Sequence, residues 1–330
     1  MPGSEPREWL GYIRFSGRTN PQGETCAGTV EVTNRRATLQ PRHLEIGGTT
    51  KDNSPEQAGA HGEGLKLALL VMMRGRQNHR VRCSSGGFSW AFNFTNLGKL
   101  VAHLSRMTPS RIRNAEERAR KQCAKSLLPV AVSLERDVQF VIGEKGRGRD
   151  HHGDQTSRSP VTRGEFESWL KAALFLQDVG ADVIFRTKQG DLISEPSLRG
   201  NVYLKGLLLA ESSKGCSASI TGKRLKFGYN FSNGRTNRER QSLKGAKQES
   251  QAVLAIWQHV LLSHPALVPD LVEMLDSDEP EYADVSMAER HLREGIVLKI
   301  KDHLLGDRFA GKWYYAGDEG NRVGLVPSLL

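Results

Sequence analysis

One stretch of the chain, Pro41–Gly75, constrains its fold more than any other. It reads PRHLEIGGTTKDNSPEQAGAHGEGLKLALLVMMRG and sets a polar, glycine-rich segment directly before a helix of mostly apolar residues. Glycine in front of a helix is entropically costly, so it marks a backbone that turns tightly or lies close to another group. Gly59, Gly62 and Gly64 have the spacing G-x-x-G-x-G. The pattern predicts a helix whose start is fixed and opens on a loop.

Two familiar phosphate-binding loops do not fit this segment. A dinucleotide-binding unit places its glycines directly after a strand, whereas here a polar loop intervenes. Gly222 and Lys223 are followed by Arg224 instead of Ser or Thr, and they lack the upstream glycine of the other loop type. What remains is a loop that ends on a helix N-terminus, where N–H groups and the helix dipole favour a phosphate. The alternative is a loop that only caps a core helix.

The helix after the glycines has apolar residues in every direction. Leu65, Ala68, Leu69 and Met72 form one face, and Leu67, Leu70 and Val71 form much of the other. We therefore expect the helix to be buried on nearly all sides.

Composition bounds the class of protein. The chain has 330 residues, of which 38% are hydrophobic and 25% charged, and it has no apolar run of the roughly 18 residues that a membrane crossing needs. The N-terminal MPGSEPREWLGYIRF lacks the apolar core of a signal peptide, so we expect an intracellular protein, cytoplasmic or nuclear, with no membrane partner. The four cysteines have no C-x-x-C spacing, which argues against zinc and against a disulfide framework.

A net charge of +10 makes nucleic acid a candidate partner, since Lys and Arg that neutralise phosphates supply most non-specific affinity. Much of the excess lies in SRMTPSRIRNAEERARKQCAK, KGRGRDHHGDQTSRSPVTR and NGRTNRERQSLKGAK. The ordinary interpretation of such runs is a solvated basic face or loop.

Apolar periodicity gives a coarse outline of the elements. Before residue 143 it predicts strands at 30–33 and 138–142, a hairpin of 81–84 with 88–94, and a helix over 112–125. Residues 143–163 have no apolar period and read as the domain boundary. Beyond them, Thr162 and Glu165 form a capping box before the helix FESWLKAALFL. Strands are then expected at 182–187, 191–193, 201–209 and 225–231, and helices from 251 onward.

The loop and helix resemble the ATP-binding module of the GHKL superfamily, which groups gyrase, the ninety-kilodalton heat-shock chaperones, histidine kinases and the mismatch-repair ATPases. The residues that carry the likeness are TLQPRHLEIGGTTK and AGAHGEGLKLALLVMMR, followed by the hairpin with Trp90. The chain is most similar to uncharacterised fungal members and, more distantly, to the MORC ATPases. The strings GNVYLKGLLL and LKFGYNFSNGRTNRER extend the likeness over most of the chain from Val30.

The resemblance implies roles for single residues. Asn34 stands where the superfamily has the Asp that contacts the adenine amino group, and an amide oxygen accepts the same hydrogen bond. Thr49, Thr50 and Lys51 match the start of the ATP lid. The phosphates are expected to lie against the glycine box and helix start, which comprise Gly59, His61, Gly62, Glu63, Gly64, Leu65 and Lys66, with His61 and Glu63 at variable positions.

The N-terminal segment departs from the superfamily. In members of the superfamily, the first helix carries a Glu that activates water and, four residues later, an Asn that holds Mg²⁺. Here Glu8 is the candidate base, Tyr12 stands at the Asn position, and NRRAT replaces the D-N-G-x-G motif. Hydrolysis requires a positioned carboxylate and a metal. We therefore expect weak ATP binding without turnover, and we predict no metal ligands.

The expected architecture is α+β. Its parts are a two-layer GHKL-type sandwich over 1–142 that is incomplete at the N-terminus, a basic linker over 143–163, a transducer-like α/β domain over 164–250 and a helical region over 251–330. The expected function is an ATP-binding switch, in which lid closure is coupled to the second domain and to a protein client. A nucleotide-free pseudo-ATPase scaffold and a basic nucleic-acid-binding clamp stay open as alternatives. Lys205 is either a phosphate sensor from the second domain or the outward-facing residue of a strand.

Overall fold

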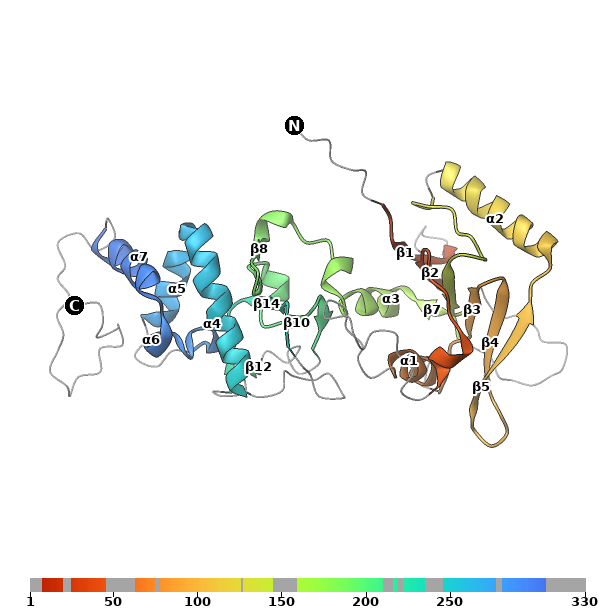
Figure 1. The fold of residues 1–330 in the computed structure, drawn as a ribbon, viewed down its shortest axis with the longest axis horizontal. Helices are drawn as coiled ribbons and strands as arrows, with labels where there is room; N and C mark the ends of the chain where they lie inside the picture. The colour runs from red at the N-terminus through yellow and green to blue at the C-terminus, as the bar shows by residue number, and fades with distance from the viewer. Residues whose placement is uncertain are drawn as a thin grey trace. The chain divides into compact units, whose positions relative to one another are not determined.

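The computed structural model describes residues 8–19, 25–45, 63–74, 78–125, 127–144, 159–209, 216–218, 222–234, 246–276 and 281–306. These residues form an α+β protein of two compact units, which divide between Trp169 and Leu170 (Figure 1). We call them unit 1 and unit 2 and describe each by itself.

Unit 1 is built on a sheet of seven strands in the order β1-β2-β6-β3-β4-β5, with β7 also paired to β2, and every pairing is antiparallel. Its strands are β1 (Gly11–Thr19), β2 (Thr25–Asn34), β3 (Val81–Ser85), β4 (Phe88–Phe94), β5 (Leu100–Arg106), β6 (Val138–Ile142) and β7 (Val161–Thr162). Its helices are α1 (Gly64–Arg74), α2 (Pro109–Ala124) and α3 (Arg163–Leu170), and a 3-10 turn, η1, covers Pro41–Leu44.

The hairpin β3–β4 forms at the expected residues because its loop supplies the required backbone. Gly86 and Gly87 have φ values of +59° and +76°, the left-handed pair that a two-residue hairpin turn needs. Trp90 and Phe92 lie two residues apart on β4, so they share one face of the strand, and both are buried. Burial raises the pKa of the Cys83 thiol on β3 to about 12, so this cysteine packs as a small apolar side chain.

Different helices pack on the two faces of the sheet in unit 1. On one face the core includes Val30, Trp90 and Leu69 of α1, with Phe166 and Trp169 of α3 packed against it. A separate cluster packs α2 near Tyr12, and its members are Met107, Val132, Leu134, Tyr12, Ile112 and Ala115. Figure 1 accordingly shows α1 and α2 on different sides of the unit 1 sheet.

The division between the units falls later than the segment 143–163 where composition placed the domain boundary. The capping box forms as expected: the Thr162 backbone N–H donates to Glu165 Oε2 at 2.7 Å, and the Glu165 N–H donates to Thr162 Oγ1 at 3.2 Å. The helix that it starts, α3, belongs to unit 1, since its aromatic residues pack on the unit 1 core and β7 pairs with β2. Helix α3 ends at Leu170, because Leu174 N–H donates to the Gly206 carbonyl instead of continuing the helix.

Unit 2 contains a five-stranded mixed sheet in the order β11-β10-β14-β9-β8, in which only β10 and β14 are parallel. Its strands are β8 (Ile184–Arg186), β9 (Gly190–Ile193), β10 (Val202–Leu204), β11 (Leu207–Leu208) and β14 (Gly228–Phe231), with a separate pair of β12 (Cys216–Ala218) and β13 (Lys223–Arg224). Its helices are α4 (Ala246–Ser263), α5 (Val268–Leu275), α6 (Ala288–His291) and α7 (Glu294–Leu305).

The sheet and helices of unit 2 share one core, so the expected division at residue 250 does not appear in the contacts. Leu192 and Tyr229 of the sheet, Trp257 of α4, Leu271 of α5 and Ile300 of α7 all belong to it. Gly190 lets α4 lie close to β9, because a Cβ there would meet the Asn230 carbonyl oxygen at 2.4 Å and Ile256 Cδ1 at 2.9 Å.

Two expected elements of unit 2 are interrupted. The strand expected over 201–209 is a hairpin that turns at Lys205 and Gly206. The helix expected over the stretch MAERHLREGIVLKIKDHLL breaks at Arg293, whose extended backbone (ψ 145°) separates α6 from α7. Among the helices of the described ranges, none has the length and apolar character that a bilayer crossing requires.

Candidate functional site

The structure describes about half of the residues that the sequence assigns to a nucleotide site. Glu63, Gly64, Leu65 and Lys66 are described at the start of α1, and Asn34 at the end of β2. Thr49, Thr50, Lys51, Gly59, His61 and Gly62 lie outside the described residues. The candidate site is therefore built here from Asn34 and the start of α1.

Helix α1 begins at Gly64, the last glycine of the box. Its first intrahelical bond joins the Leu67 N–H to the Glu63 carbonyl at 3.0 Å. The N–H groups of the preceding three residues have no acceptor within the helix, as at every helix start. Together with the helix dipole they favour an anion, and the first turn of α1 contains no acidic residue.

Gly64 is exposed and stands in open space. A Cβ built on it meets no atom of the described residues within 4 Å. Packing among those residues therefore does not require glycine here, in contrast to Gly190 in unit 2. The backbone at Gly64 is therefore accessible to another group.

Lys66 connects the helix start to the segment before it. Its ammonium group donates a hydrogen bond to the backbone carbonyl of Glu45, the last described residue before Glu63. Leu44, next to Glu45, packs against the same core as α1. This contact holds a positive charge close to the N–H groups at the start of α1.

Asn34 lies on the sheet face that α1 covers. Val30 belongs to the core that Leu69 of α1 enters, and Val32 packs against it. Side chains two residues apart on a strand share a face, so Asn34 shares theirs. Asn34 is exposed at the end of β2, which leaves its amide open to a ligand on the α1 side.

The expectation that α1 is buried on nearly every side is wrong. Leu69 and Met73 are buried, but Leu67 is 52% exposed and Val71 is 70% exposed. The reason is geometric: α1 packs on one face of a sheet, so only the stripe that faces the strands is buried.

The N-terminal segment forms a strand, and not the catalytic helix that the resemblance implies. Gly11–Thr19 pairs with β2 along its whole length. The alternation of Ile13 and Phe15 with Tyr12 and Arg14 was a signal for this strand. A base and a metal ligand spaced four residues apart therefore do not share a helix face here.

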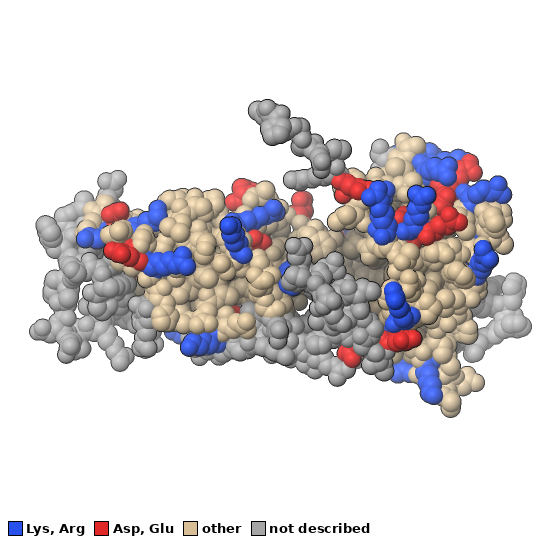
Figure 2. All heavy atoms as spheres, viewed as in Figure 1, with Lys and Arg blue, Asp and Glu red and all other residues tan. Residues whose placement is uncertain are grey.

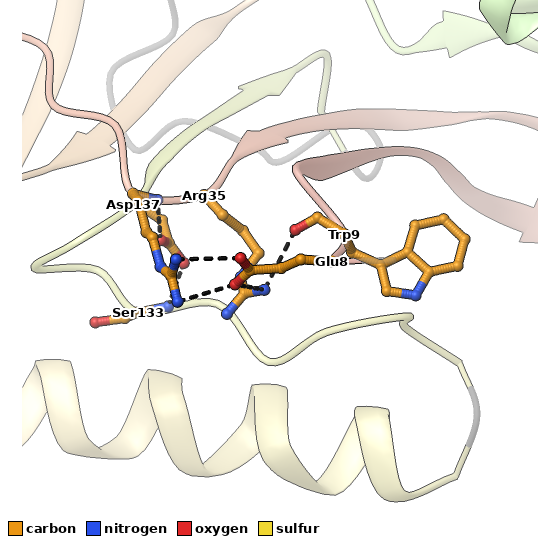
Figure 3. A network of polar contacts seen from close by, with 6 residues as sticks. Glu8, Trp9, Arg35, Ser133 and Asp137 are labelled. Atoms are coloured by element: carbon orange, nitrogen blue, oxygen red, sulfur yellow. Dashed lines mark hydrogen bonds and ion pairs between the residues drawn. The ribbon is translucent and has the colours of Figure 1, made fainter. Parts of the chain in front are cut away.

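Glu8, the candidate base, is engaged by two guanidinium groups (Figure 3). Glu8 Oε1 lies 2.9 Å from Arg36 Nη2 and 3.4 Å from Arg35 Nη1, and Glu8 Oε2 accepts from Arg36 Nη1 at 3.1 Å. The Arg36 N–H donates to Asp137 Oδ1 at 2.9 Å, and the Ser133 N–H donates to Asp137 Oδ2 at 2.9 Å. Both oxygens of Glu8 are thus occupied in a network that fixes the turn after β2.

The same network extends toward α2. Ser133 Oγ donates to Glu116 Oε1 of α2 at 3.0 Å. Tyr12, which stands at the position of the metal-binding Asn, packs in the α2 cluster, and its phenol oxygen accepts from Gln139 at 3.3 Å. These residues do not fit a Mg²⁺ site on the α1 side. In the described part of the chain, no group of three or more His, Cys, Asp or Glu is arranged to hold a metal ion.

Lys205 is not the outward-facing residue of a strand. It is the first residue of the β10–β11 turn, with a φ of +52°, and its N–H donates to the Phe231 carbonyl at 2.9 Å. The next N–H, of Gly206, donates to Asn230 Oδ1 at 2.7 Å. A lysine in the left-handed region is uncommon, and such residues concentrate at functional sites.

Comparison with known proteins does not assign the chain to a family. No protein-family model matches it, and no curated protein matches it either.

Proposed function

We propose that the chain is an ATP-binding switch of the GHKL type, in which the phosphates lie against the start of α1 and binding changes how unit 2 docks. The observation that carries the proposal is the environment of Gly64. It is the first residue of a helix, it is exposed, and the space beside it is open within the described residues. A phosphate that approaches the backbone gives a reason for a glycine that packing does not supply.

Asn34 and Lys66 support the same location. Asn34 lies on the α1 face of the sheet with an exposed amide, which accepts from and donates to an adenine edge. Lys66 places an ammonium group in the first turn of α1. A base-binding amide and a phosphate-binding helix start on one face are the minimum that a nucleotide site of this type requires.

The proposal is for binding without hydrolysis. A general base must reach the water that it activates, and both carboxylate oxygens of Glu8 are held by Arg35 and Arg36. Without a bound cation, only the helix start and nearby lysines offset the negative charge of the three phosphates. We therefore expect weak affinity, little changed by Mg²⁺.

The test is a calorimetric titration of the full chain with ATP, with and without Mg²⁺. Gly64→Val should weaken binding at least tenfold, because the added side chain occupies the space that the phosphate needs. The matched control is Gly164→Val, at the second position of α3, where a Cβ also meets no described atom within 4 Å. Both variants should keep the wild-type circular dichroism.

Two results would contradict the proposal. Equal affinity in the wild type and Gly64→Val would leave the glycine box with only a capping role. A wild type that binds no nucleotide at millimolar concentration would favour the nucleotide-free scaffold. Steady ATP turnover that is lost in Glu8→Ala would contradict only the claim that hydrolysis is absent.

A further inference from the structure

Helix α2 and its C-cap carry a high density of positive charge on an exposed surface. No residue of the helix is fully buried. The six cationic residues, all exposed, are Arg111, Arg113, Arg118, Arg120, Lys121 and Lys125. Against them stand two carboxylates, Glu116 and Glu117, which leaves a net charge of +4. In Figure 2, basic side chains accordingly lie over the part of unit 1 where Figure 1 shows α2.

The cations form two rows along the flanks of the helix. Ile112 and Ala115 face the core of unit 1. Arg111, Arg118 and Lys125 follow one another at intervals of seven residues, which is two turns and about 10.5 Å. Arg113 and Arg120 have the same interval and lie on the opposite flank, since two residues along a helix rotate the side chain by about 200°. The solvent-facing surface between the rows carries Asn114, Glu117 and Lys121.

The carboxylates of α2 do not neutralise these rows. Glu116 Oε2 lies 3.7 Å from Arg120, and Glu117 Oε1 lies 2.9 Å from Lys121. The Glu117–Lys121 pair joins two exposed side chains and contributes little to stability, and the 3.7 Å between Glu116 and Arg120 is longer than a hydrogen bond. For Arg111, Arg118 and Lys125, no ion pair occurs with any residue in the described ranges.

The helix is held in place before any partner binds. Thr108 caps it, with its hydroxyl oxygen accepting from the Arg111 N–H at 3.3 Å, and Pro109 occupies the first helical position. Ser133 anchors the middle of the helix through Glu116. Arg118 Nε donates to the Asn114 carbonyl at 3.1 Å, which steadies its guanidinium group. A rigid helix loses little conformational entropy on binding.

We propose that α2 is a contact surface for duplex DNA, whose two phosphate backbones meet the two rows of cations. An α-helix with its side chains is about 10–12 Å across, and the major groove of B-DNA is about 12 Å wide. The outer surface of α2 lies along the groove, and the flanking arginines and lysines contact the phosphates on either side. The contacts are to phosphate, so binding is largely independent of base sequence.

The chemistry of α2 favours a duplex over other polyanions. Proteins that bind single strands stack bases on aromatic side chains, and α2 contains no aromatic residue. The major groove of A-form RNA is too deep and narrow for side chains to read. Two parallel rows of cations match two parallel rows of phosphates, which an acidic peptide does not present. The inference does not depend on nucleotide binding by α1.

The experiment measures fluorescence anisotropy of a labelled 20-base-pair duplex with the full chain, without nucleotide, over a series of salt concentrations. The test variant is Arg111→Gln/Arg118→Gln/Lys125→Gln. The control variant, Arg186→Gln/Lys188→Gln/Lys301→Gln, makes the same change in net charge at exposed positions of unit 2. Circular dichroism confirms that both variants are folded.

We expect the α2 variant to bind the duplex at least tenfold more weakly than the control at low salt. Its plot of log affinity against log salt should be shallower by about 2.7, since each lost phosphate contact removes about 0.9. Equal slopes in the two variants would overturn the proposal, as would a wild type that does not bind at 50 mM salt. Tighter binding to a single strand or to polyglutamate than to the duplex would also overturn it.

Discussion

The phenol of Tyr229 donates a hydrogen bond to Oδ1 of Asp284 in the core of unit 2. Trp257 Nε1 donates to the same phenol oxygen at 2.8 Å, and the backbone N–H of Lys226 donates to Asp284 Oδ2 at 2.8 Å. Asp284 is only 3% exposed. The carboxylate therefore connects the 3-10 turn η7 (Ala283–Val285) to the chain before β14 and, through Tyr229, to α4.

This carboxylate makes the stability of unit 2 depend on pH. Burial raises the pKa of Asp284 from 3.8 to about 6, against the opposing effect of its hydrogen bonds. Because the folded-state pKa is the higher one, the stabilising contribution is complete below about pH 4 and is lost as the pH rises through 6. A difference of about two pKa units corresponds to about 3 kcal/mol.

We therefore expect the free energy of unfolding of the wild type, relative to Asp284→Asn, to increase by up to about 3 kcal/mol as the pH falls from 7 to 4. Urea denaturation at several pH values measures it. Asp302→Asn, on the exposed side of α7, is the control and should follow the wild type. Parallel curves for the wild type and Asp284→Asn would contradict the prediction.

The two faces of α1 should respond differently to truncation. Leu69 is 2% exposed, and Leu69→Ala should destabilise unit 1 by about 2–5 kcal/mol through lost burial and the cavity left behind. Val71 is 70% exposed, and Val71→Ala should change stability by no more than about 0.5 kcal/mol. Denaturant unfolding of the two variants decides the point, and a comparable loss in both would mean that α1 is covered on its outer side.

We expect the protein to be less stable with lysine at position 205 than with glycine there. A non-glycine residue at a φ of +52° costs about 1 kcal/mol relative to glycine. We expect Lys205→Gly to be more stable than Lys205→Ala by about that amount in thermal unfolding. If the strain is retained because the side chain senses phosphate, both variants should also lose any effect of ATP on proteolysis of unit 2. An ATP effect that survives in both would assign the lysine to the turn alone.

We expect Asn34 to contribute to binding of the adenine base and not to binding of the phosphates. Asn34→Ala should weaken ATP binding about fivefold, the value of one hydrogen bond of about 1 kcal/mol, and leave the binding of inorganic triphosphate unchanged. Asn34→Asp should retain the acceptor and the affinity for ATP. Competition titrations measure both ligands. A parallel loss of ATP and triphosphate in Asn34→Ala would show that the residue acts on the fold of the site.

Local chemistry made several elements predictable from the sequence. The β3–β4 hairpin follows from two glycines between alternating strands, and α3 follows from the capping box of Thr162 and Glu165. These signals lie within a few residues of one another. Which face of α1 is buried was not predictable in the same way, because its sequence is apolar on all sides and does not identify the side that packs on the sheet.

Contacts distant in sequence were missed. Asp284 lies 55 residues from Tyr229, and nothing in the segment EYADVSM marks it as the centre of a buried network. The occupation of Glu8 by Arg35 and Arg36 depends on the pairing of β1 with β2, which brings the two ends of the hairpin together. For the candidate site, the glycine box indicated where α1 begins, and the role of Asn34 stays a prediction. The turn at Lys205 was not predictable from the sequence. The stretch YLKG has the pattern of a strand, and the turn depends on a hydrogen bond from Gly206 to the distant residue Asn230.

The pairing of β2 has a consequence for synthesis of the chain. One edge of β2 can pair with β1 as soon as β2 is synthesised, but its other edge pairs with β6 and β7. Asn34 cannot pair until Val138 has been synthesised, and Gly28 cannot pair until Val161 has been synthesised. At a translation rate of about 5–20 residues per second, the 104 residues from Asn34 to Val138 take about 5–20 s to emerge. During that interval β2 presents an unpaired edge, the type of surface at which nascent chains associate. The nascent chain on the ribosome, more than the finished protein, is therefore where this fold is exposed to aggregation and to capture by chaperones.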